Sequence, residues 1–206
     1  QREFDRMKPG LDQKDSWQYM QEMLPLVQDL WRGDVAHKGR FWQFPSATSC
    51  PKPLQKTVPM WVAARSPITF DYAVANDCNI MSWPLTLPFS EAVKYRTQLD
   101  EAIAKNGGTY AGRFAMMRHT TVYETASDRQ SALDATRGVL SQFGNLIMKS
   151  GEVRNGFPDP VPLESLDGNF RVEPKMLEDN LMFGSPSQVI DNLGKYQEIG
   201  VDAFIS

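Results

Sequence analysis

The sequence predicts an α/β fold, an incomplete (β/α)8 barrel, from three observations. Helical and strand-like segments alternate along most of the 206 residues, the order expected of a parallel sheet covered by helices. No predicted strand is followed by the Gly-x-Gly-x-x-Gly motif of a dinucleotide-binding doubly wound sheet. Four parallel strands alone would leave two open edges, so they fit better as the C-terminal half of an eight-stranded barrel.

The first quarter of the chain precedes the predicted sheet. Apolar residues recur at helical spacing over 16–32, and Pro25 should bend the axis of that helix because it removes a backbone hydrogen bond. We expect a hairpin at about 35–44, packed outside the sheet, with its turn at Lys38-Gly39. A proline-rich extended connector, 45–59, should then lead into the first strand of the sheet.

The alternating elements follow this connector and form the predicted barrel half. Caps of the Ser-Pro type, glycines after helices and short apolar runs set the boundaries. We expect strands at 60–64, 80–83, 113–124 and 201–205, and helices at 67–76, 90–105, 127–143 and 186–199. A segment rich in glycine, proline and acidic residues, 150–175, should be a lid-like excursion from a single partial barrel domain, 1–206. Both ends of the sequence look cut.

The turn after the 60–64 strand carries the strongest functional signal. Ser66 suits an N-cap and Pro67 suits the first helical position, so free backbone N–H groups should point out of the turn. Hydroxyls at Ser66 and Thr69 and the guanidinium of Arg65 add further donors, and such a helix N-terminus attracts phosphate. The alternative interpretation is that Ser-Pro only starts a helix, which is its commoner role.

Composition limits the remaining classes of function. A net charge of −3 with scattered basic residues gives no reason to expect nucleic acid or an anionic membrane as a partner. The two cysteines lack metal-ligand spacing, which indicates a reducing cytoplasm and no metal. No apolar stretch approaches the about 20 residues needed to span a bilayer. A hydrolase triad has no support either, because no Gly-x-Ser-x-Gly motif is present.

Four ordered landmarks resemble the bacterial-luciferase-like flavin monooxygenases, a branch of the (β/α)8 barrels. They are Gln1-Arg-Glu-Phe-Asp-Arg; Gly39-Arg-Phe-Trp-Gln-Phe with Pro51-Lys-Pro-Leu-Gln; Pro59-Met-Trp-Val-Ala-Ala-Arg-Ser-Pro; and Met182-Phe-Gly-Ser-Pro-Ser-Gln-Val-Ile with Gly200-Val-Asp-Ala-Phe. The resemblance covers the family from just after barrel strand four to strand eight. It implies that catalytic groups on the first four strands, and a final helix, lie outside this sequence.

The resemblance also implies a cofactor site. It identifies the backbone at Ala64–Arg65, with Ser66 and Thr69, as ligands of a flavin phosphate, although family members vary at the position of Arg65. It places Trp83 near the isoalloxazine ring, where an indole offers an apolar wall and one donor. An ordinary core tryptophan is the alternative. His119 is a candidate catalytic residue, but a lone histidine in a strand is more often a structural hydrogen-bonding group.

The implied activity is that of a monooxygenase. Reduced FMN, supplied by a separate flavin reductase, would react with O2 and oxygenate a small organic substrate, in a cytoplasmic homo- or heterodimer. Two alternatives remain open: hydride transfer with the deazaflavin F420 in the same fold, and a non-catalytic flavin-binding or partner subunit.

Overall fold

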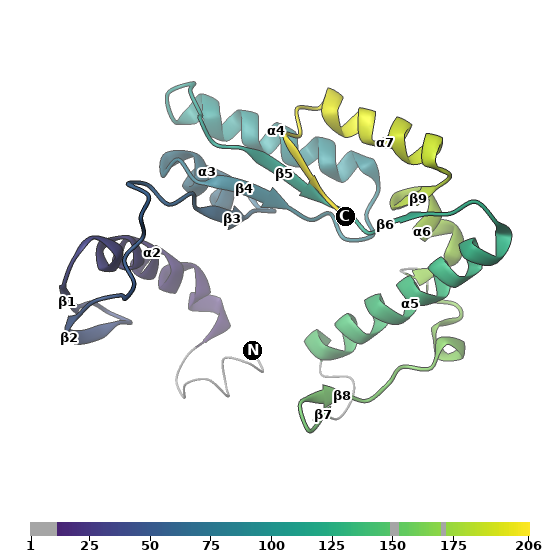
Figure 1. Ribbon diagram of the computed structural model, residues 1–206, viewed down its shortest axis with the longest axis horizontal. Helices are drawn as coiled ribbons and strands as arrows, with labels where there is room; N and C mark the ends of the chain where they lie inside the picture. Colours follow the sequence, from purple (N-terminus) through teal and green to yellow (C-terminus); the bar gives the residue numbers. More distant parts are fainter. Residues whose placement is uncertain (1–11, 149–152, 170–171) are drawn as a thin grey trace. The chain divides into compact units, whose positions relative to one another are not determined.

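The chain forms two compact units in the computed structural model, which describes residues 12–148, 153–169 and 172–206 (Figure 1). One unit lies within Gln1–Val58 and the other within Pro59–Ser206. The first landmark of the resemblance, residues 1–6, lies outside the described residues, as do parts of the expected excursion.

The first unit consists of a helix and a hairpin. Its elements are the 3-10 turn η1 (Gln13–Asp15), the helix α2 (Ser16–Arg32) and the antiparallel strands β1 (Val35–Lys38) and β2 (Gln43–Ala47). The predicted hairpin is present and continues to Ala47, and its strands pair only with each other among the described residues. Pro25 lies inside α2, which continues past it to Arg32.

One carboxylate anchors the hairpin turn to α2. Glu22 accepts hydrogen bonds from the backbone amides of Phe41 at 3.1 Å and Trp42 at 2.9 Å, and it lies 3.1 Å from His37 Nε2. These contacts lower the pKa of the Glu22 carboxyl despite the opposing effect of burial. Gly39 fits beside this cluster because a Cβ there would stand 2.0 Å from the carboxylate.

The second unit contains the predicted parallel sheet. Its strands are β3 (Trp61–Ala63), β4 (Asn79–Ser82), β5 (Phe114–Met117) and β10 (Ala203–Ile205). They run in the order β10-β5-β4-β3, all parallel, so each predicted strand lies beside its neighbour in the chain. This is the order of consecutive strands in a (β/α)8 barrel.

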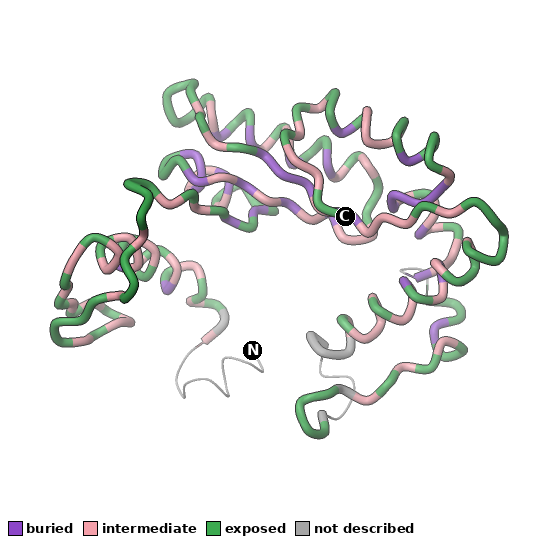
Figure 2. The backbone as a smooth tube through the Cα atoms, viewed as in Figure 1, coloured by how far each residue is buried: buried purple, intermediate pink, exposed green. Residues whose placement is uncertain are grey.

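Within the described part of this unit, helices cover one face of the sheet. The helices are α3 (Pro67–Ala75), α4 (Phe89–Lys105) and α7 (Pro186–Glu198), and Figure 1 shows α4 and α7 along one side of the strands. Val62, Ile80 and Phe114 share one register row and are buried, and the ring of Phe114 lies 6.5 Å from that of Phe70 in α3, so this row faces the helices. Buried residues follow the strands and the helices that cover them (Figure 2). Side chains alternate along a strand, so the next residues along β3 and β4 face the opposite side.

The predicted 113–124 strand is wrong in one respect, because it is two strands. β5 ends at Met117, and β6 (Thr120–Val122) pairs instead with β9 (Met182–Gly184), a strand that the sequence analysis did not predict. The chain changes partners at Arg118 and His119: the Arg118 amide still bonds to β10, whereas the His119 carbonyl bonds to β9. The continuous strand-like sequence 113–124 therefore contributes one strand to each of two different sheets.

The excursion packs against a long helix. α5 (Ala126–Met148) extends beyond its predicted end, and it is followed by β7 (Val153–Arg154), β8 (Phe157–Pro158), η2 (Leu163–Leu166) and α6 (Pro174–Asn180). Leu133 of α5 forms a buried cluster with Leu177, Leu181 and Phe183. An ion pair between Arg137 and Asp167, at 2.8 Å, ties α5 to the segment after η2.

Candidate functional site

The turn between β3 and α3 lies at the carboxyl end of the parallel sheet, where (β/α)8 barrels place their sites. Ser66 is the N-cap of α3, with extended backbone angles (φ −126°, ψ 151°), and Pro67 is the first helical residue. Ala64 is fully buried, and both of its backbone polar groups are used inside the fold. Ala64 therefore positions the turn without offering a free donor.

Two hydroxyls lie together at this helix N-terminus. Thr69 Oγ1 donates to the Ser66 carbonyl at 2.8 Å, and it accepts from the Ser66 amide at 3.3 Å. Ser66 Oγ lies 2.8 Å from Thr69 Oγ1 and must be the donor, because the single hydroxyl proton of Thr69 is already used. An anion at this turn would compete for both hydroxyl protons.

Further donors at the turn have no partner. The backbone amides of Arg65 and Ile68 make no hydrogen bond to any residue that the structure describes. The exposed guanidinium of Arg65 likewise has no carboxylate partner within 12–148, 153–169 and 172–206. Together with the helix dipole of α3, these groups make a local excess of positive potential suited to an anion.

This turn forms part of the rim of an open pocket with a volume of about 800 Å3. The pocket takes in four of the predicted cofactor residues in addition to side chains from the opposite sheet face and from neighbouring elements. Its lining comprises Ala63, Ala64, Arg65, Ser66, Thr69, Met81, Trp83, Leu85, Leu87, Glu91, Tyr95, Met117 and Phe143. Trp83, the fifth predicted cofactor residue, lines the same pocket, and most of the pocket wall is apolar.

Two residues of α4 add polar groups to this wall. Burial raises the pKa of the Tyr95 phenol and the nearby Glu91 carboxylate raises it further, whereas Arg65 acts in the opposite direction. Tyr95 therefore keeps its proton and can act as a hydrogen-bond donor. Glu91 is engaged with Lys94 at 3.2 Å, which limits its repulsion of an anion in the pocket.

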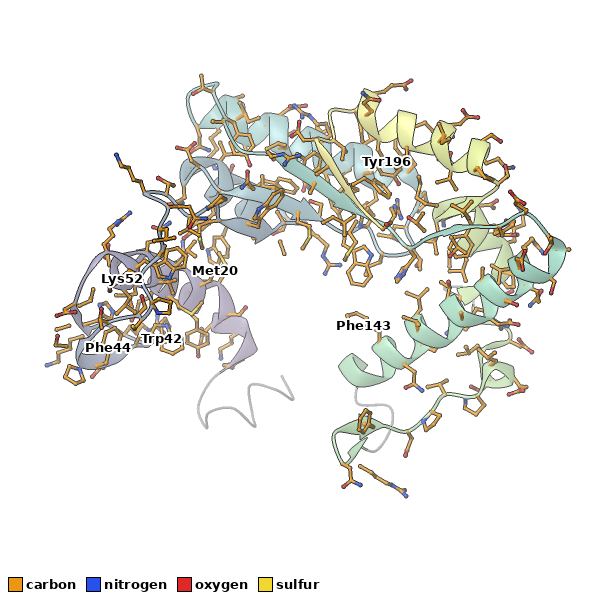
Figure 3. The ribbon with its side chains drawn as sticks, viewed as in Figure 1. Met20, Trp42, Phe44, Lys52, Phe143 and Tyr196 are labelled. Atoms are coloured by element: carbon orange, nitrogen blue, oxygen red, sulfur yellow. The ribbon has the colours of Figure 1, made fainter. Side chains whose placement is uncertain are left out.

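Trp83 belongs to an aromatic cluster with two unused polar atoms. Its ring centroid lies 5.8 Å from that of His119 and 5.6 Å from that of Phe143, which projects from α5 (Figure 3). Trp83 Nε1 and His119 Nε2 are both buried without a hydrogen-bond partner among the described residues. Burial lowers the pKa of His119, so the imidazole is neutral near pH 7. His119 contacts Trp83 but is not itself part of the pocket lining.

The sequence analysis missed two buried residues that support this site. Ser82 Oγ donates to the Ala64 carbonyl at 2.7 Å and so ties β4 to the β3–α3 turn. Arg118 is fully buried behind the loop that carries Leu85 and Leu87. A hydroxyl within the apolar run 80–83 was a signal for the first residue, but nothing local marked the second.

Other kinds of site have no counterpart in the described part of the chain. No three His, Cys, Asp or Glu side chains gather there closely enough to hold a metal ion. No helix there combines the length and the apolar character that crossing a bilayer requires. Cys50 and Cys78 are both free thiols.

The family of the chain follows from comparison with known proteins. The model of the luciferase-like monooxygenase family matches residues 1–203. The chain belongs to this family. A curated relative, the oxygenase component of a flavin-dependent trigonelline monooxygenase from Acinetobacter baylyi, is 34% identical over 203 residues. The match covers 98% of this chain and 56% of the relative, so the chain spans about half the length of that protein.

Solved structures agree with the luciferase-like fold. A monooxygenase from Streptomyces bottropensis matches with a TM-score of 0.64 at 20% identity, over 95% of this chain and 55% of its own. An F420-dependent secondary alcohol dehydrogenase has the same TM-score and identity, over 89% of this chain and 53% of its own. The prediction of an incomplete (β/α)8 barrel is confirmed, because the likeness covers nearly all of this chain and roughly half of each neighbour.

Proposed function

We propose that the full-length protein carrying this chain is a flavin-dependent monooxygenase, which uses reduced FMN and O2 to oxygenate a small organic substrate. Membership of the luciferase-like monooxygenases supports this proposal, as does the flavin dependence of the Acinetobacter relative. The observation that carries the proposal is the group of unused donors at the N-terminus of α3, beside an open and largely apolar pocket.

The residues at this turn fit the phosphate of FMN. The amides of Arg65 and Ile68 are free to donate, and the hydroxyls of Ser66 and Thr69 lie beside them. The Arg65 guanidinium adds a positive charge that no described carboxylate neutralises. Ala64 contributes by holding the backbone of the turn in place.

The other residues have roles in orientation and exclusion of water. Trp83 would offer its indole face and its unpaired Nε1–H to the ring of the flavin or to the substrate. His119 packs against Trp83 and fixes its orientation, and its neutral Nε2 is the one candidate for proton exchange in this cluster. Reduced flavin held by these residues would supply the electrons needed to place one oxygen atom of O2 on the substrate and to reduce the other to water.

A second candidate activity is hydride transfer with F420, because a solved structure of the same fold is an F420-dependent alcohol dehydrogenase. The two cofactors share a phosphate-bearing side chain but differ in their absorbance spectra. The spectrum of the chromophore that copurifies with the full-length protein distinguishes the two activities. A non-catalytic flavin-binding subunit is recognised by stoichiometric flavin binding without substrate-linked O2 uptake.

The partners and organisation of the protein are part of the same proposal. The Acinetobacter relative is an oxygenase component, which supports a separate flavin reductase as the source of reduced FMN here. We also propose a single barrel domain to which 1–206 contributes one half, a homo- or heterodimer, and a cytoplasmic location. The free thiols of Cys50 and Cys78 suit a reducing compartment.

The decisive experiment compares FMN with riboflavin, which lacks the phosphate. In the full-length protein, Ser66→Ala should weaken FMN affinity by about tenfold, the scale of one lost hydrogen bond to a charged group. Riboflavin affinity should not change. Both dissociation constants can be measured by quenching of flavin fluorescence.

Ser185→Ala is the matched control, because Ser185 caps α7 in the same Ser-Pro arrangement and accepts a hydrogen bond from the Gln188 amide at 3.4 Å. It removes a helix cap outside the pocket and should leave both affinities unchanged. Equal loss of FMN and riboflavin affinity in Ser66→Ala would contradict the phosphate site. A wild-type protein that binds neither flavin would overturn the proposed function.

A further inference from the structure

The loop between β4 and α4, residues 84–88, presents Leu85 and Leu87 to the pocket. All five of its carbonyl groups accept hydrogen bonds. The Leu87 amide donates to the Pro84 carbonyl at 3.0 Å, which closes a turn within the loop. Asn180, at the end of α6, donates to the Thr86 carbonyl at 3.0 Å. The other three carbonyls share one partner.

That partner is Arg118, whose side chain is fully buried. Its Nη1 donates to the carbonyls of Leu85 at 3.1 Å and Leu87 at 2.7 Å. Its Nη2 donates to the Pro88 carbonyl at 3.3 Å, and its Nε donates to the Tyr196 hydroxyl at 2.8 Å. Tyr196 projects from α7 toward the sheet (Figure 3), so one guanidinium joins β5, the pocket loop and α7.

The arrangement is unusual because every hydrogen-bond partner of this buried cation is neutral. Burying a charge is costly unless hydrogen bonds replace its hydration, and four charge-assisted bonds do so here. A planar guanidinium can direct several N–H groups at fixed angles, whereas a lysine ammonium is a compact charge that cannot span three separated carbonyls in the same way. The site therefore requires arginine geometry and not merely a positive charge.

The backbone of the loop gives an independent reason for such a clamp. Leu85 has φ of 58°, a left-handed conformation that residues with a side chain rarely adopt. A conformation of this kind persists only where surrounding contacts hold it. The carbonyl of this strained residue is one of those bound by Arg118, so the contact and the strain lie at the same peptide group.

We propose that Arg118 is a positioning residue, which holds the 84–88 loop in one conformation so that Leu85 and Leu87 form a fixed apolar wall of the pocket. Because Arg118, Asn180 and the Leu87 amide engage all five carbonyl groups of the loop, none is left without a hydrogen bond, and the loop contributes the side chains of Leu85 and Leu87 to the pocket. This apolar wall suits an apolar part of an organic substrate, and that assignment of the substrate rests on the proposed function. The clamp itself does not depend on that function.

The test is hydrogen–deuterium exchange on the full-length protein without flavin. In Arg118→Lys, peptides that span Leu85–Phe89 should exchange at least about tenfold faster than in the wild type, because the Leu87 amide loses its ordered turn. Peptides from β4 and α3 should exchange as before. The matched control is Arg113→Lys, since Arg113 is an exposed arginine immediately before β5 that bonds to the Asp202 carbonyl and not to the loop.

Chemical rescue separates the clamp from general packing. In Arg118→Ala, added methylguanidinium can enter the space left by the side chain and should restore the slow exchange of the loop, whereas added methylammonium should not. Unchanged loop exchange in Arg118→Lys overturns the proposal. The proposal is also overturned if Arg118→Lys and Arg118→Ala both raise the exchange rate uniformly over the whole 59–206 unit and methylguanidinium does not restore slow exchange. Because the exchange experiment contains no flavin, failure of FMN binding would overturn the proposed function without affecting the conclusion about Arg118 and the loop.

Discussion

At the scale of single residues, the polar side chains in the pocket and directly behind it differ in how many of their hydrogen-bonding groups already have a partner. Ser66 and Thr69 bond to each other, and Ser82 is committed to the backbone of the turn. Trp83 and His119 each keep one buried polar atom without a partner among the described residues. Unpaired buried groups of this kind are costly, and a ligand that completes their hydrogen bonding would remove that cost.

The partly buried imidazole of His119 predicts a pH dependence of stability. Its pKa is lowered by burial in the folded protein and lies near 6.5 when the chain is unfolded. The unfolded state therefore binds more protons below pH 6.5, so folded stability is complete above that pH and falls as the pH drops toward the folded pKa. His119→Gln should remove this loss, as measured by urea unfolding of the full-length protein between about pH 5 and pH 8.

The second histidine supplies the control for this measurement. His37→Gln removes an imidazole that lies beside Glu22 in the other unit, and it should leave the contribution of His119 in place. If wild-type and His119→Gln proteins show parallel curves from pH 8 down to pH 5, His119 is not desolvated in solution.

At the scale of elements, the helix boundaries were predictable wherever they depend on close neighbours in sequence. The Ser-Pro pairs at residues 66–67 and 185–186 begin α3 and α7, and both helices start where the sequence analysis placed them. The strand at 113–124 was not predictable in this way. Its two halves have similar composition, and only their partners, β4 and β10 for one and β9 for the other, divide them.

The end of α7 offers a test at this scale with two glycines. Gly200 follows the helix with φ of 77°, and its amide and that of Val201 bond back to the last turn. Gly200→Ala should destabilise the protein by about 1 kcal/mol or more, since alanine disfavours this conformation. A Cβ would also stand 2.9 Å from Arg96 Nη1. The shift of the urea midpoint in the full-length protein measures the effect.

Gly194 is the matched substitution within the same helix. Apart from the adjacent residues and the backbone of α7 itself, no described atom lies within 4 Å of a Cβ built there, so Gly194→Ala should stabilise the protein by about 0.5–1 kcal/mol through helix propensity alone. Changes of opposite sign in the free energy of unfolding, caused by the same glycine-to-alanine substitution six residues apart, would show that the backbone conformation at each site decides the effect. The same sign for both would show that the conformation at Gly200 is not the one described.

At the scale of the whole molecule, the chain divides between Val58 and Pro59 into two compact units. The segment before this boundary has no regular secondary structure, and Leu54 is fully exposed. The sequence analysis treated this segment as a connector inside one domain, and the single-domain organisation stays a prediction for the full-length protein. Its proline content explains the absence of strands, because proline cannot donate to a sheet.

This division predicts where a protease first cuts the full-length protein. Lys56 is exposed in the irregular segment and forms no hydrogen bond with any described residue, so trypsin should cleave first after Lys56. Lys52 is protected by the following Pro53 and by its bonds to the end of α2. Mass spectrometry of a short digestion identifies the site, and Lys56→Gln should abolish that first cut. An earlier cut at any other residue contradicts the prediction.

The sequence by itself determined the alternation of strands and helices, the caps of α3 and α7, and the position of the Ser66-Pro67 turn, proposed to bind an anion, at the carboxyl end of a parallel strand. Each of these depends on residues within a few positions of one another. Only the tertiary structure decided the partners of the Arg118 guanidinium, the closest of which is 30 residues away in sequence, and the separation of β5 from β6. Such contacts depend on how distant segments meet in space, and no local pattern carries that information.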